Sequence, residues 1–223
     1  MIDTIHERIH AIRSKLPESV QLLAITKTVT SEVIRSAYNA GIRDFGENRI
    51  QEAIKKQNAL QDLTDITWHF IGHLQSNKAK KALQCFSWIH SVDNLKLAEH
   101  LHKLAVKLKV SPLVLLQVKI LPDPTKSGWH IPQLMADLPT LNNFKNLKIQ
   151  GLMTIPPQGL NETQTLEIFN RTRELAVEIQ SQNWSHIQMK NLSMGMSGDY
   201  HLAIQAGATM VRLGTILFGE RLS

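Results

Sequence analysis

Short apolar runs rich in β-branched residues alternate along the chain with stretches whose apolar positions recur every three or four residues. The runs have the length and composition of buried strands, and the other stretches have the periodicity of amphipathic helices. Because strand and helix alternate, a parallel sheet is predicted. The eight predicted strands are QLLAIT (21–26), IRDFG (42–46), TWHFIG (67–72), FSWIHS (86–91), PLVLLQVKI (112–120), LKIQGLMTI (147–155), IQMKNLSM (187–194) and TMVRLG (209–214).

Helices are predicted at the N-terminus and between the strands. Isoleucines three or four residues apart begin the chain, and Pro17 ends that helix. Ser31 and Asp93 are predicted N-caps of two later helices, because short polar side chains accept hydrogen bonds from free backbone N–H groups. The later helices are predicted over residues 31–41, 48–60, 93–109 and 162–182.

Eight strand-and-helix units in about 200 residues fit a closed (β/α)₈ barrel of the TIM type, here preceded by an extra N-terminal helix. The alternative is an open doubly wound sheet, which usually has fewer strands and a glycine-rich fingerprint after the first one; the chain lacks that fingerprint. No shift in composition and no linker divides the sequence, so residues 1–223 are predicted to form a single domain. The longest irregular stretch, LPDPTKSGWHIP (121–132), follows the fifth strand.

The composition is typical of a globular cytoplasmic protein, with 43% hydrophobic and 20% charged residues. The single cysteine, Cys85, cannot form an internal disulfide, which is typical of a reducing cytosol. The charged N-terminal segment differs from a signal peptide, and no stretch approaches the roughly 18 apolar residues of a membrane span. We therefore expect a cytoplasmic protein that does not bind membranes.

The formal net charge of +6 raises the hypothesis of nucleic-acid binding. The basic residues are scattered, however, and cluster only at NKAKK (77–81). A basic helix face is usually solvated surface. Binding to nucleic acid is therefore not expected, and a basic nucleic-acid-binding module is kept only as an alternative.

Lys27 follows the first predicted strand almost at once. A lysine at such a position is usually a solvated loop residue, because lysine is rarely fully buried. In a (β/α)₈ barrel, however, the active site lies at the carboxyl ends of the strands. Polar residues also follow several other strands, as in FGENR and GHLQSNK. This coincidence favours a functional role for Lys27.

Two segments after the last two strands have residues suited to phosphate. SMGMSGDYHLAIQAG places Ser193, Gly195 and Ser197 before a predicted helix, and RLGT adds the Gly214 N–H and the Thr215 hydroxyl. Glycines allow the backbone to approach a ligand, and free N–H groups at a helix start hold phosphate. Either segment alone is as well explained by a turn that caps a helix. At adjacent strands of a barrel, the two together favour a phosphate site.

A lysine that forms a Schiff base, together with a phosphate site across the barrel, suggests pyridoxal phosphate. Arg212 stands two residues before Gly214, so the two positions share one face of the strand. A phosphate held at Gly214 would place Arg212 near the pyridine ring. The alternative for Arg212 is a salt bridge on the barrel wall.

Six motifs occur in order over essentially the whole chain, namely AITKT, FGENRIQEA, WHFIGHLQSNK, GLMTIPP, LSMGMSGDY and VRLGTILFGER. In these motifs the sequence resembles the pyridoxal phosphate homeostasis protein family, the YggS/PROSC type. That family is similar in fold to the barrel domain of bacterial alanine racemase. The resemblance therefore implies a fold-type III pyridoxal phosphate-binding barrel.

The resemblance also implies which residues contact the cofactor. Lys27 is expected to carry pyridoxal 5′-phosphate as a Schiff base (an internal aldimine), and Arg212 to face the pyridine nitrogen. Either Ser193 or Ser197 is expected to bind the phosphate, and the spacing to Arg212 favours Ser197. Further implied contacts are to the phosphate from Gly214, Thr215 and the backbone of the turn that begins at Met194, and to the ring from Asn48 and Met153.

The chemistry expected of this site is limited. An arginine cannot accept a proton, so the ring nitrogen should stay unprotonated and carbanions should be poorly stabilised. Racemisation needs a second acid or base on the far face of the substrate. In alanine racemase a tyrosine from an additional domain of a partner subunit supplies it. The only tyrosines here, Tyr38 and Tyr200, fall inside predicted helices and are interpreted as packing residues.

The resemblance implies a monomeric, non-enzymatic carrier or regulator in intracellular vitamin B6 homeostasis and amino-acid/keto-acid balance. Its expected partners are pyridoxal phosphate and either cofactor-accepting enzymes or regulatory proteins. The alternative is a pyridoxal phosphate-dependent, racemase-like enzyme, and weak racemase-type activity remains compatible with the site. No metal is expected, because His69 and His73, although four residues apart, fall on a predicted strand and its exit.

Overall fold

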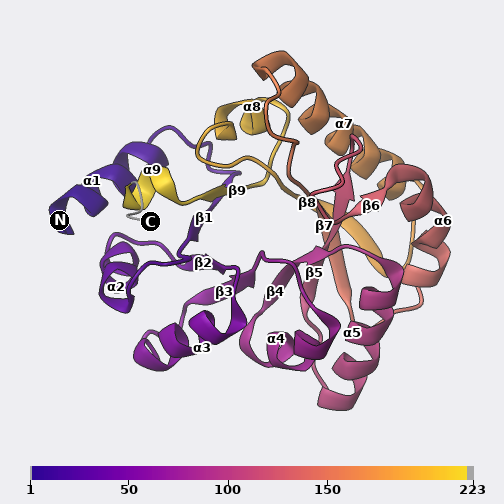
Figure 1. Ribbon diagram of the computed structural model, residues 1–223, viewed down its shortest axis with the longest axis horizontal. Coiled ribbons are helices and arrows are strands. Elements are labelled where there is room, and N and C mark those ends of the chain that lie inside the picture. The colour runs from indigo at the N-terminus through magenta and orange to yellow at the C-terminus, as the bar shows by residue number, and fades with distance from the viewer. Residues whose placement is uncertain (1, 220–223) are drawn as a thin grey trace.

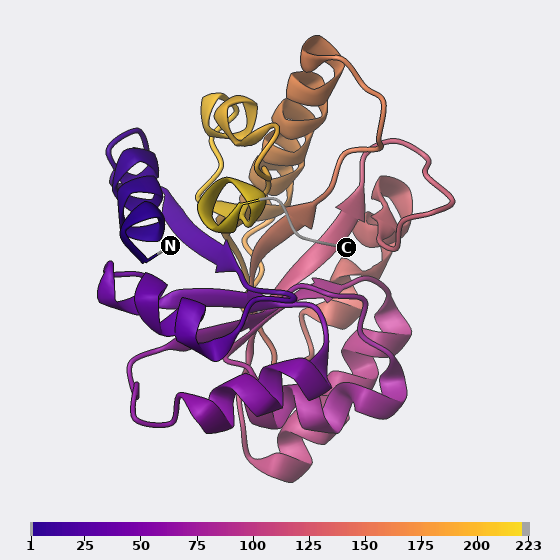
Figure 2. The same ribbon diagram turned by 60° about the vertical axis from the view of Figure 1, so that its left-hand side comes forward.

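Eight parallel strands close into a barrel in the computed structural model, which describes residues 2–219 (Figures 1 and 2). Neighbouring strands pair in the order β4-β3-β2-β1-β9-β8-β7-β5, and pairing of β4 with β5 closes the ring. A ninth strand, β6, pairs with the end of β5. The strands are β1 (Gln21–Ile25), β2 (Asp44–Glu47), β3 (Thr67–Phe70), β4 (Trp88–Val92), β5 (Leu113–Lys119), β6 (Trp129–His130), β7 (Lys148–Thr154), β8 (Ile187–Ser193) and β9 (Met210–Leu213).

Helices surround the barrel, and α1 packs against α2 and α9 near the N-terminus (Figure 1). Apart from α1 and α9, the α-helices connect one parallel strand to the next, as a parallel sheet requires. The helices are α1 (Ile2–Arg13), α2 (Ser31–Asn39), α3 (Ile50–Ala59), α4 (Ala79–Cys85), α5 (Leu95–Leu108), α6 (Ile131–Leu141), α7 (Glu162–Ser181), α8 (Tyr200–Gln205) and α9 (Thr215–Phe218), with the short 3₁₀ helix η1 (Ser76–Lys78) before α4.

The predicted (β/α)₈ barrel and its extra N-terminal helix are confirmed. Each of the eight predicted strands overlaps an observed one. The strand β6 lies in the stretch 121–132, which was expected to be irregular, because two residues are too few to show an alternating pattern. The division of the chain into one domain stays a prediction, consistent with the single continuous sheet.

The two predicted helix caps are wrong by one residue. Thr30 precedes α2 as its N-cap, and Ser31 is the first helical residue. The N-cap of α5 is Asn94, whose side-chain oxygen accepts a hydrogen bond from Leu97 N–H at 2.8 Å. The Asp93 carboxylate instead accepts a hydrogen bond from the Asn94 side chain. Adjacent polar residues compete for the cap, and composition alone does not decide between them.

The barrel interior is separate from the main core between the strands and the helices. Alternate residues along each strand face these two environments. Leu115, Met153 and Met210 form a small inner cluster, against which Trp88 and Ile155 pack. Other residues inside the barrel are polar, so the interior is only partly an apolar core.

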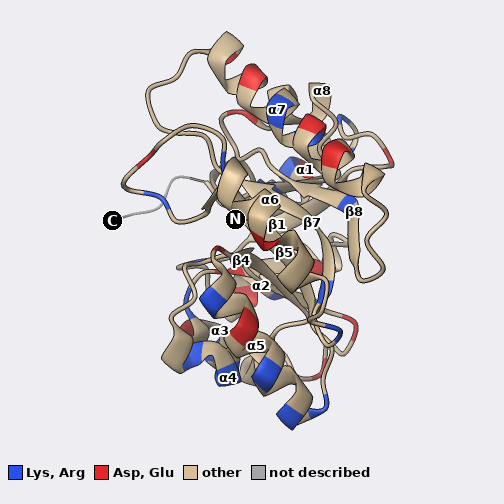
Figure 3. Cartoon of the chain, turned by 90° about the vertical axis from the view of Figure 1, so that its right-hand side faces the viewer, with Lys and Arg blue, Asp and Glu red and all other residues tan. Residues whose placement is uncertain are grey.

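Charged residues of both signs are interspersed on the helices seen in Figure 3. Within residues 2–219, no helix has the length and apolar character needed to cross a membrane. The expectations of a cytoplasmic location and of no nucleic-acid binding stay predictions.

Candidate functional site

A cavity of about 400 Å³ opens at the carboxyl ends of the barrel strands. Its lining comes from the ends of β1, β2, β3, β7, β8 and β9 and from the loops that follow them. This is where ligands bind in (β/α)₈ barrels. The lining residues are Ile25, Lys27, Asn48, Ile71, Gly72, Ile155, Met196, Ser197, Gly198, Arg212, Gly214 and Thr215.

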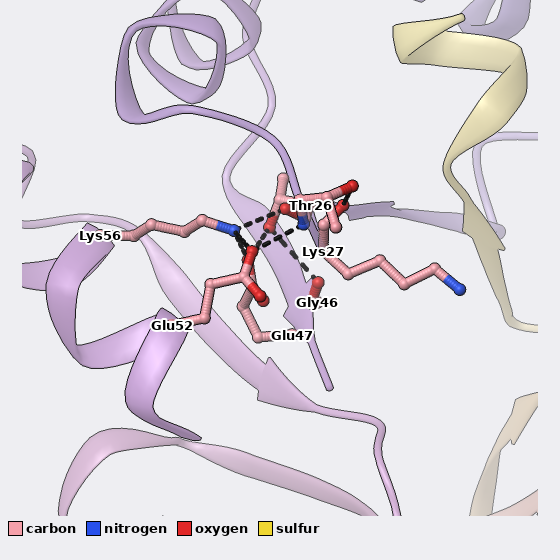
Figure 4. A network of polar contacts seen from close by, with 7 residues as sticks. Thr26, Lys27, Gly46, Glu47, Glu52 and Lys56 are labelled. Carbon is pink, nitrogen blue, oxygen red and sulfur yellow. Dashed lines mark hydrogen bonds and ion pairs between the residues drawn. The ribbon is translucent and has the colours of Figure 1, made fainter. Parts of the chain in front are cut away.

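Lys27 contributes an amine to this cavity. It lies in the turn two residues beyond Ile25, the last residue of β1, and both residues line the cavity. Figure 4 shows the Lys27 side chain extending away from the polar network behind it. Lys27 therefore lies at the cavity wall, and its role in a functional site stays a prediction.

A network on the helix side of β1 and β2 holds the backbone on both sides of Lys27 (Figure 4). The Lys56 ammonium of α3 donates hydrogen bonds to Glu47 Oε1 and Glu52 Oε1, each at 2.6 Å. It also donates to the carbonyl oxygen of Thr26 at 2.6 Å. Glu52 Oε1 accepts a hydrogen bond from the Thr28 N–H at 2.6 Å. We call Thr26, Thr28, Glu47, Glu52 and Lys56 the strand-end cluster.

The strand-end cluster fixes a turn that the backbone would not readily adopt alone. Thr28 has a φ of +63°, in the left-handed region that β-branched residues rarely occupy. Its N–H is held by Glu52, while the carbonyl of Thr26 is held by Lys56. Because the backbone is anchored at residues 26 and 28, the backbone of Lys27 between them is held in place at the cavity wall.

Charge in the strand-end cluster is buried as well as paired. Glu47 is fully buried, and burial raises the pKa of its carboxyl above the ordinary value despite the hydrogen bonds from Lys56 and Thr26. Burial also acts on Glu52, but its hydrogen bonds, first from Lys56, outweigh burial and lower the pKa of that carboxyl. Glu47 Oε2 has no hydrogen-bond partner among the described residues.

Arg212 places a buried cation at the base of the cavity. Its side chain is 4% exposed, and its NH1 donates to the carbonyl oxygen and the hydroxyl of Ser193, while NH2 donates to the Thr154 carbonyl oxygen at 2.9 Å. Burial lowers the pKa of Arg212 to about 10, so the guanidinium still carries its charge at neutral pH. These contacts do not form the alternative salt bridge on the barrel wall, because the partners of Arg212 are a hydroxyl and two carbonyl oxygens.

Ser197, Gly214 and Thr215 form the part of the cavity suited to an anion. The Ser197 hydroxyl accepts hydrogen bonds from the N–H groups of Gly214 at 3.3 Å and Ile216 at 3.4 Å. The loop after β8 and the start of α9 are thereby joined. The hydroxyls of Ser197 and Thr215 both belong to the lining here, where they could donate to a phosphate.

Three predicted contacts, Ser193, Met153 and Met194, lie outside the cavity lining. Ser193 is fully buried and its hydroxyl bonds to Arg212 and His90. Met153 packs in the inner cluster beneath Ile155, which does line the cavity. A direct contact of either residue with a cofactor stays a prediction.

Two N–H groups of the turn that begins at Met194 have partners inside the protein, and the predicted backbone contact with a phosphate stays a prediction. The Met194 N–H donates to the Met210 carbonyl oxygen at 3.1 Å, within the sheet. The Met196 N–H donates to the Asp199 carboxylate at 2.6 Å. Because both N–H groups are used inside the protein, only the other N–H groups of this turn can reach a phosphate.

Some residues of the site were missed in the sequence. Gly72 follows β3, and a Cβ built there would lie 2.3 Å from the Asn48 carbonyl oxygen, so only glycine allows this close approach. The glycine in FIGH was the available signal. His73, which that motif also offers, is 61% exposed and lies beside Asp93. Within the described chain, no group of three or more histidine, cysteine or carboxylate side chains could hold a metal ion.

The donor set of the cavity fits pyridoxal phosphate. Lys27 provides a primary amine for an aldehyde, and the Ser197 region provides hydrogen-bond donors for a phosphate. Three of the five N–H bonds of Arg212 are used by the protein, and the other two have no acceptor among the described residues. Those two are available to an acceptor on an aromatic ring.

A closed (β/α)₈ barrel with a lysine after its first strand and an anion site after its last two defines an alanine racemase-like barrel. The chain belongs to the alanine racemase N-terminal domain family, whose pattern it matches over residues 1–222. Its relatives include proteins named "Pyridoxal phosphate homeostasis protein", which confirms the resemblance stated from the motifs. The one from Synechocystis sp. is 55% identical and covers 95% of this chain and 96% of its own length, and the one from Aquifex aeolicus is 44% identical with 90% and 87% covered.

Solved structures agree with this assignment. PipY of Synechococcus elongatus with pyridoxal phosphate bound has a TM-score of 0.92 and 51% sequence identity, and covers 96% of this chain and all of its own. The same protein without the cofactor has a TM-score of 0.94. Alanine racemase from Clostridium difficile has a TM-score of 0.82 at 15% identity, and this chain spans 58% of that protein. The last comparison shows the shared barrel alone.

Proposed function

We propose that this chain is a pyridoxal phosphate-binding protein of vitamin B6 homeostasis, with the cofactor held covalently by Lys27. The observation that carries the proposal is the convergence of Lys27, Arg212 and the Ser197 region on one cavity. The names of the close relatives and the cofactor-bound PipY structure support it.

Each group has a distinct task in binding. The Lys27 amine would capture the aldehyde, Arg212 would direct N–H groups at the ring nitrogen, and the hydroxyls of Ser197 and Thr215 would donate to the phosphate. The Gly214 N–H would join them by exchanging its hydrogen bond to Ser197 Oγ for one to the phosphate. Asn48 lies at the cavity wall, where it would flank the ring. When bound, pyridoxal phosphate can act as an electron sink, and a protonated ring nitrogen makes that sink stronger. Arg212 would donate hydrogen bonds to that nitrogen and would supply no proton.

The lining also favours binding over turnover. Among the lining residues only Lys27 and Arg212 carry ionisable side chains. Tyr38 lies elsewhere and donates its hydroxyl proton to Asp65, and Tyr200, in α8, does not line the cavity. A second acid or base for racemisation is therefore not part of the described cavity wall. We infer a carrier or regulator without strong catalysis, which affects amino-acid/keto-acid balance through the cofactor.

Several finer expectations belong to the same proposal. The protein is expected to be a monomer, to act in the cytoplasm, and to deliver the cofactor to accepting enzymes or regulatory proteins. The alternative is a racemase-like enzyme, since alanine racemase has the same barrel.

The first test is covalent capture of the cofactor. The purified protein is mixed with pyridoxal phosphate, reduced with borohydride and digested for peptide mass analysis. We expect the cofactor on the peptide that contains Lys27, and loss of the visible absorbance band in Lys27→Ala. Lys78→Ala, a change at a half-buried lysine in η1, serves as the matched control. Covalent labelling that persists in Lys27→Ala, on any residue, would contradict the assignment.

Turnover is tested on the same preparations. Each common amino acid is incubated with the loaded protein, and racemisation and transamination are followed over many equivalents. Steady turnover that disappears in Lys27→Ala would overturn the non-enzymatic proposal and favour the racemase-like alternative.

A further inference from the structure

A row of hydrogen-bonded polar side chains crosses the barrel interior beneath the cavity. It starts at Asp44, the first residue of β2, and continues through His69 of β3 and His90 of β4. It then reaches Ser193 at the end of β8 and Arg212 of β9. We call these five residues the barrel relay. It joins a carboxylate at the amino end of the strands to the guanidinium at the base of the cavity.

Every link of the barrel relay is within hydrogen-bonding distance. Both histidines and the serine are fully buried, so none of them can exchange its partner for solvent. The links are Asp44 Oδ1 to His69 Nε2 at 3.0 Å, His69 Nδ1 to His90 Nε2 at 2.9 Å, His90 Nδ1 to Ser193 Oγ at 2.9 Å, and Ser193 Oγ to Arg212 NH1 at 2.9 Å.

The direction of each hydrogen bond follows from the two ends. The Asp44 carboxylate only accepts, so His69 donates from Nε2 and, as a neutral ring, accepts at Nδ1. His90 must then donate to His69 from Nε2, which leaves its Nδ1 as an acceptor. Ser193 is therefore the donor to His90.

The same direction follows from the other end. Arg212 only donates, so the Ser193 oxygen accepts from NH1. Its single hydroxyl proton then needs an acceptor, because an unsatisfied buried donor is costly. His90 Nδ1 is the acceptor at 2.9 Å. Both ends therefore require one proton arrangement, in which all bonds run from the cation toward the anion.

We propose that the barrel relay positions Arg212, which makes Asp44, His69, His90 and Ser193 positioning residues for the cation that faces the cofactor. The hydroxyl and carbonyl of Ser193 hold NH1, and Thr154 holds NH2. The orientation of the two remaining N–H bonds is thereby set. Only the cofactor-facing task of Arg212 rests on the proposed function; the relay itself does not.

The electrostatics of the surroundings agree with two neutral histidines. Burial lowers the pKa of His69 below the ordinary value, against the opposing effect of Asp44. Burial, followed by the electrostatic effects of His69 and Arg212, holds the pKa of His90 well below the ordinary value. Asp199 also acts on Arg212 from the loop after β8. Trp88 stacks on the His69 ring, with centroids 5.7 Å apart, and limits its rotation.

The relay also decides between the two candidate phosphate ligands. A phosphate oxygen accepts hydrogen bonds, so a serine that binds it must donate its hydroxyl proton. The proton of Ser193 is used by His90 in the relay. Ser197 lines the cavity and accepts from two N–H groups, so its own proton remains to be donated. Ser197 is therefore the phosphate ligand, and Ser193 supports the arginine.

The test uses cofactor-free protein with ¹⁵N-labelled histidine, so it does not depend on cofactor binding. At neutral pH we expect His69 and His90 both to be neutral and protonated on Nε2. In Asp44→Leu we expect the ring nitrogen signals of His90 to change as well, although His90 does not contact Asp44. Asp137→Leu is the matched control, since it removes a buried acceptor from Trp129 outside the relay.

A His90 ring protonated on Nδ1 in the parent protein would overturn the proposal, and this readout needs no variant to fold. Unchanged His90 signals in folded Asp44→Leu would also overturn it. In cofactor-loaded protein, Asp44→Leu and Ser193→Ala are expected to shift the visible absorbance band, while Asp137→Leu leaves it in place. Failure of the protein to bind cofactor would contradict the proposed function and leave the histidine result standing.

Discussion

The strand-end cluster and the barrel relay are both buried, charged and adjacent to the cavity, but they separate their charges differently. In the strand-end cluster, Lys56 lies 2.6 Å from two carboxylates. In the barrel relay, Arg212 and Asp44 are joined through three uncharged side chains. The first lies between the barrel wall and α3, and the second lies inside the barrel.

The difference shows how each network acts on the site. Direct contact between opposite charges stabilises a fixed backbone, and the cluster bonds to the main chain on both sides of Lys27. A row of neutral donors and acceptors instead fixes the direction of hydrogen bonds, as the relay does for Arg212. The cluster sets where the lysine projects, whereas the relay sets where the arginine points.

The largest expected effect breaks the strand-end cluster. Lys56→Met leaves the fully buried Glu47 carboxylate without its cation, and loss of one partner from a buried ion pair costs about 3–5 kcal/mol. We expect the free energy of unfolding, measured in urea, to fall by that amount. Glu47→Leu combined with Lys56→Met should recover most of the loss, because neither charge is then unpaired. A single variant within about 1 kcal/mol of the parent would contradict the importance of this ion pair.

An effect of intermediate size is expected in the pH dependence of the free energy of unfolding, to which the two networks contribute with opposite sign. The pKa values of His69 and His90 lie below the ordinary 6.5, so the unfolded chain binds more protons there as the pH falls below 6.5. Their contribution to the free energy of unfolding is therefore lost on acidification, by up to about 1.4 kcal/mol per pH unit for each group. Glu47 has the opposite sign: its pKa is raised above 4.5, so its contribution is present at low pH and is lost as the pH rises.

Unfolding measured from pH 7 to pH 5 checks this difference. In His69→Gln the free energy of unfolding should decrease less between pH 7 and pH 5 than in the parent protein. In Glu47→Gln it should decrease more steeply. Asp44 has a lowered pKa, because hydrogen bonds from His69 and Gln21 outweigh burial, and its own contribution is lost at still lower pH. Identical pH profiles for the parent and His69→Gln would show that the relay does not titrate as inferred.

The smallest expected effect concerns Glu52, the half-buried member of the strand-end cluster. Glu52→Ala removes the acceptor for the Thr28 N–H. The free energy of unfolding should fall by about 1 kcal/mol at most, because water partly replaces the lost acceptor at this half-buried site. Covalent capture of pyridoxal phosphate by Lys27 should slow, because the turn at Thr28 is less fixed. Glu99→Ala, which breaks an exposed ion pair on α5, is the control. Equal capture rates in the two variants would remove Glu52 from the positioning role.

The barrel and the cavity were accessible from the sequence because they depend on local patterns. Strand periodicity located the strand ends, and residues such as Lys27, Ser197 and Arg212 stand at or just beyond those ends. The expected places of these three residues agree with the cavity lining.

The barrel relay was not accessible in the same way. His90 and Ser193 are 103 positions apart in the chain and meet only because the barrel closes with a particular register. In the sequence, Ser193 stands beside glycines, which suggested that it binds phosphate. Nothing in the sequence indicated that His90 accepts its hydroxyl proton. The strand-end cluster was missed for a similar reason, since Lys56 reads as an ordinary residue of an amphipathic helix.

The hydrogen bonds that Ser197 accepts from Gly214 and Ile216 have a consequence for how fast the cofactor can come and go. They join the loop after β8 to the start of α9 before any ligand arrives, so a ligand that binds there need not order these segments, and little conformational entropy is lost. Association then does not wait for a loop to close. Residence time would depend instead on the covalent bond at Lys27, so that the chemistry of one amine, rather than the motion of a lid, sets the rate of exchange.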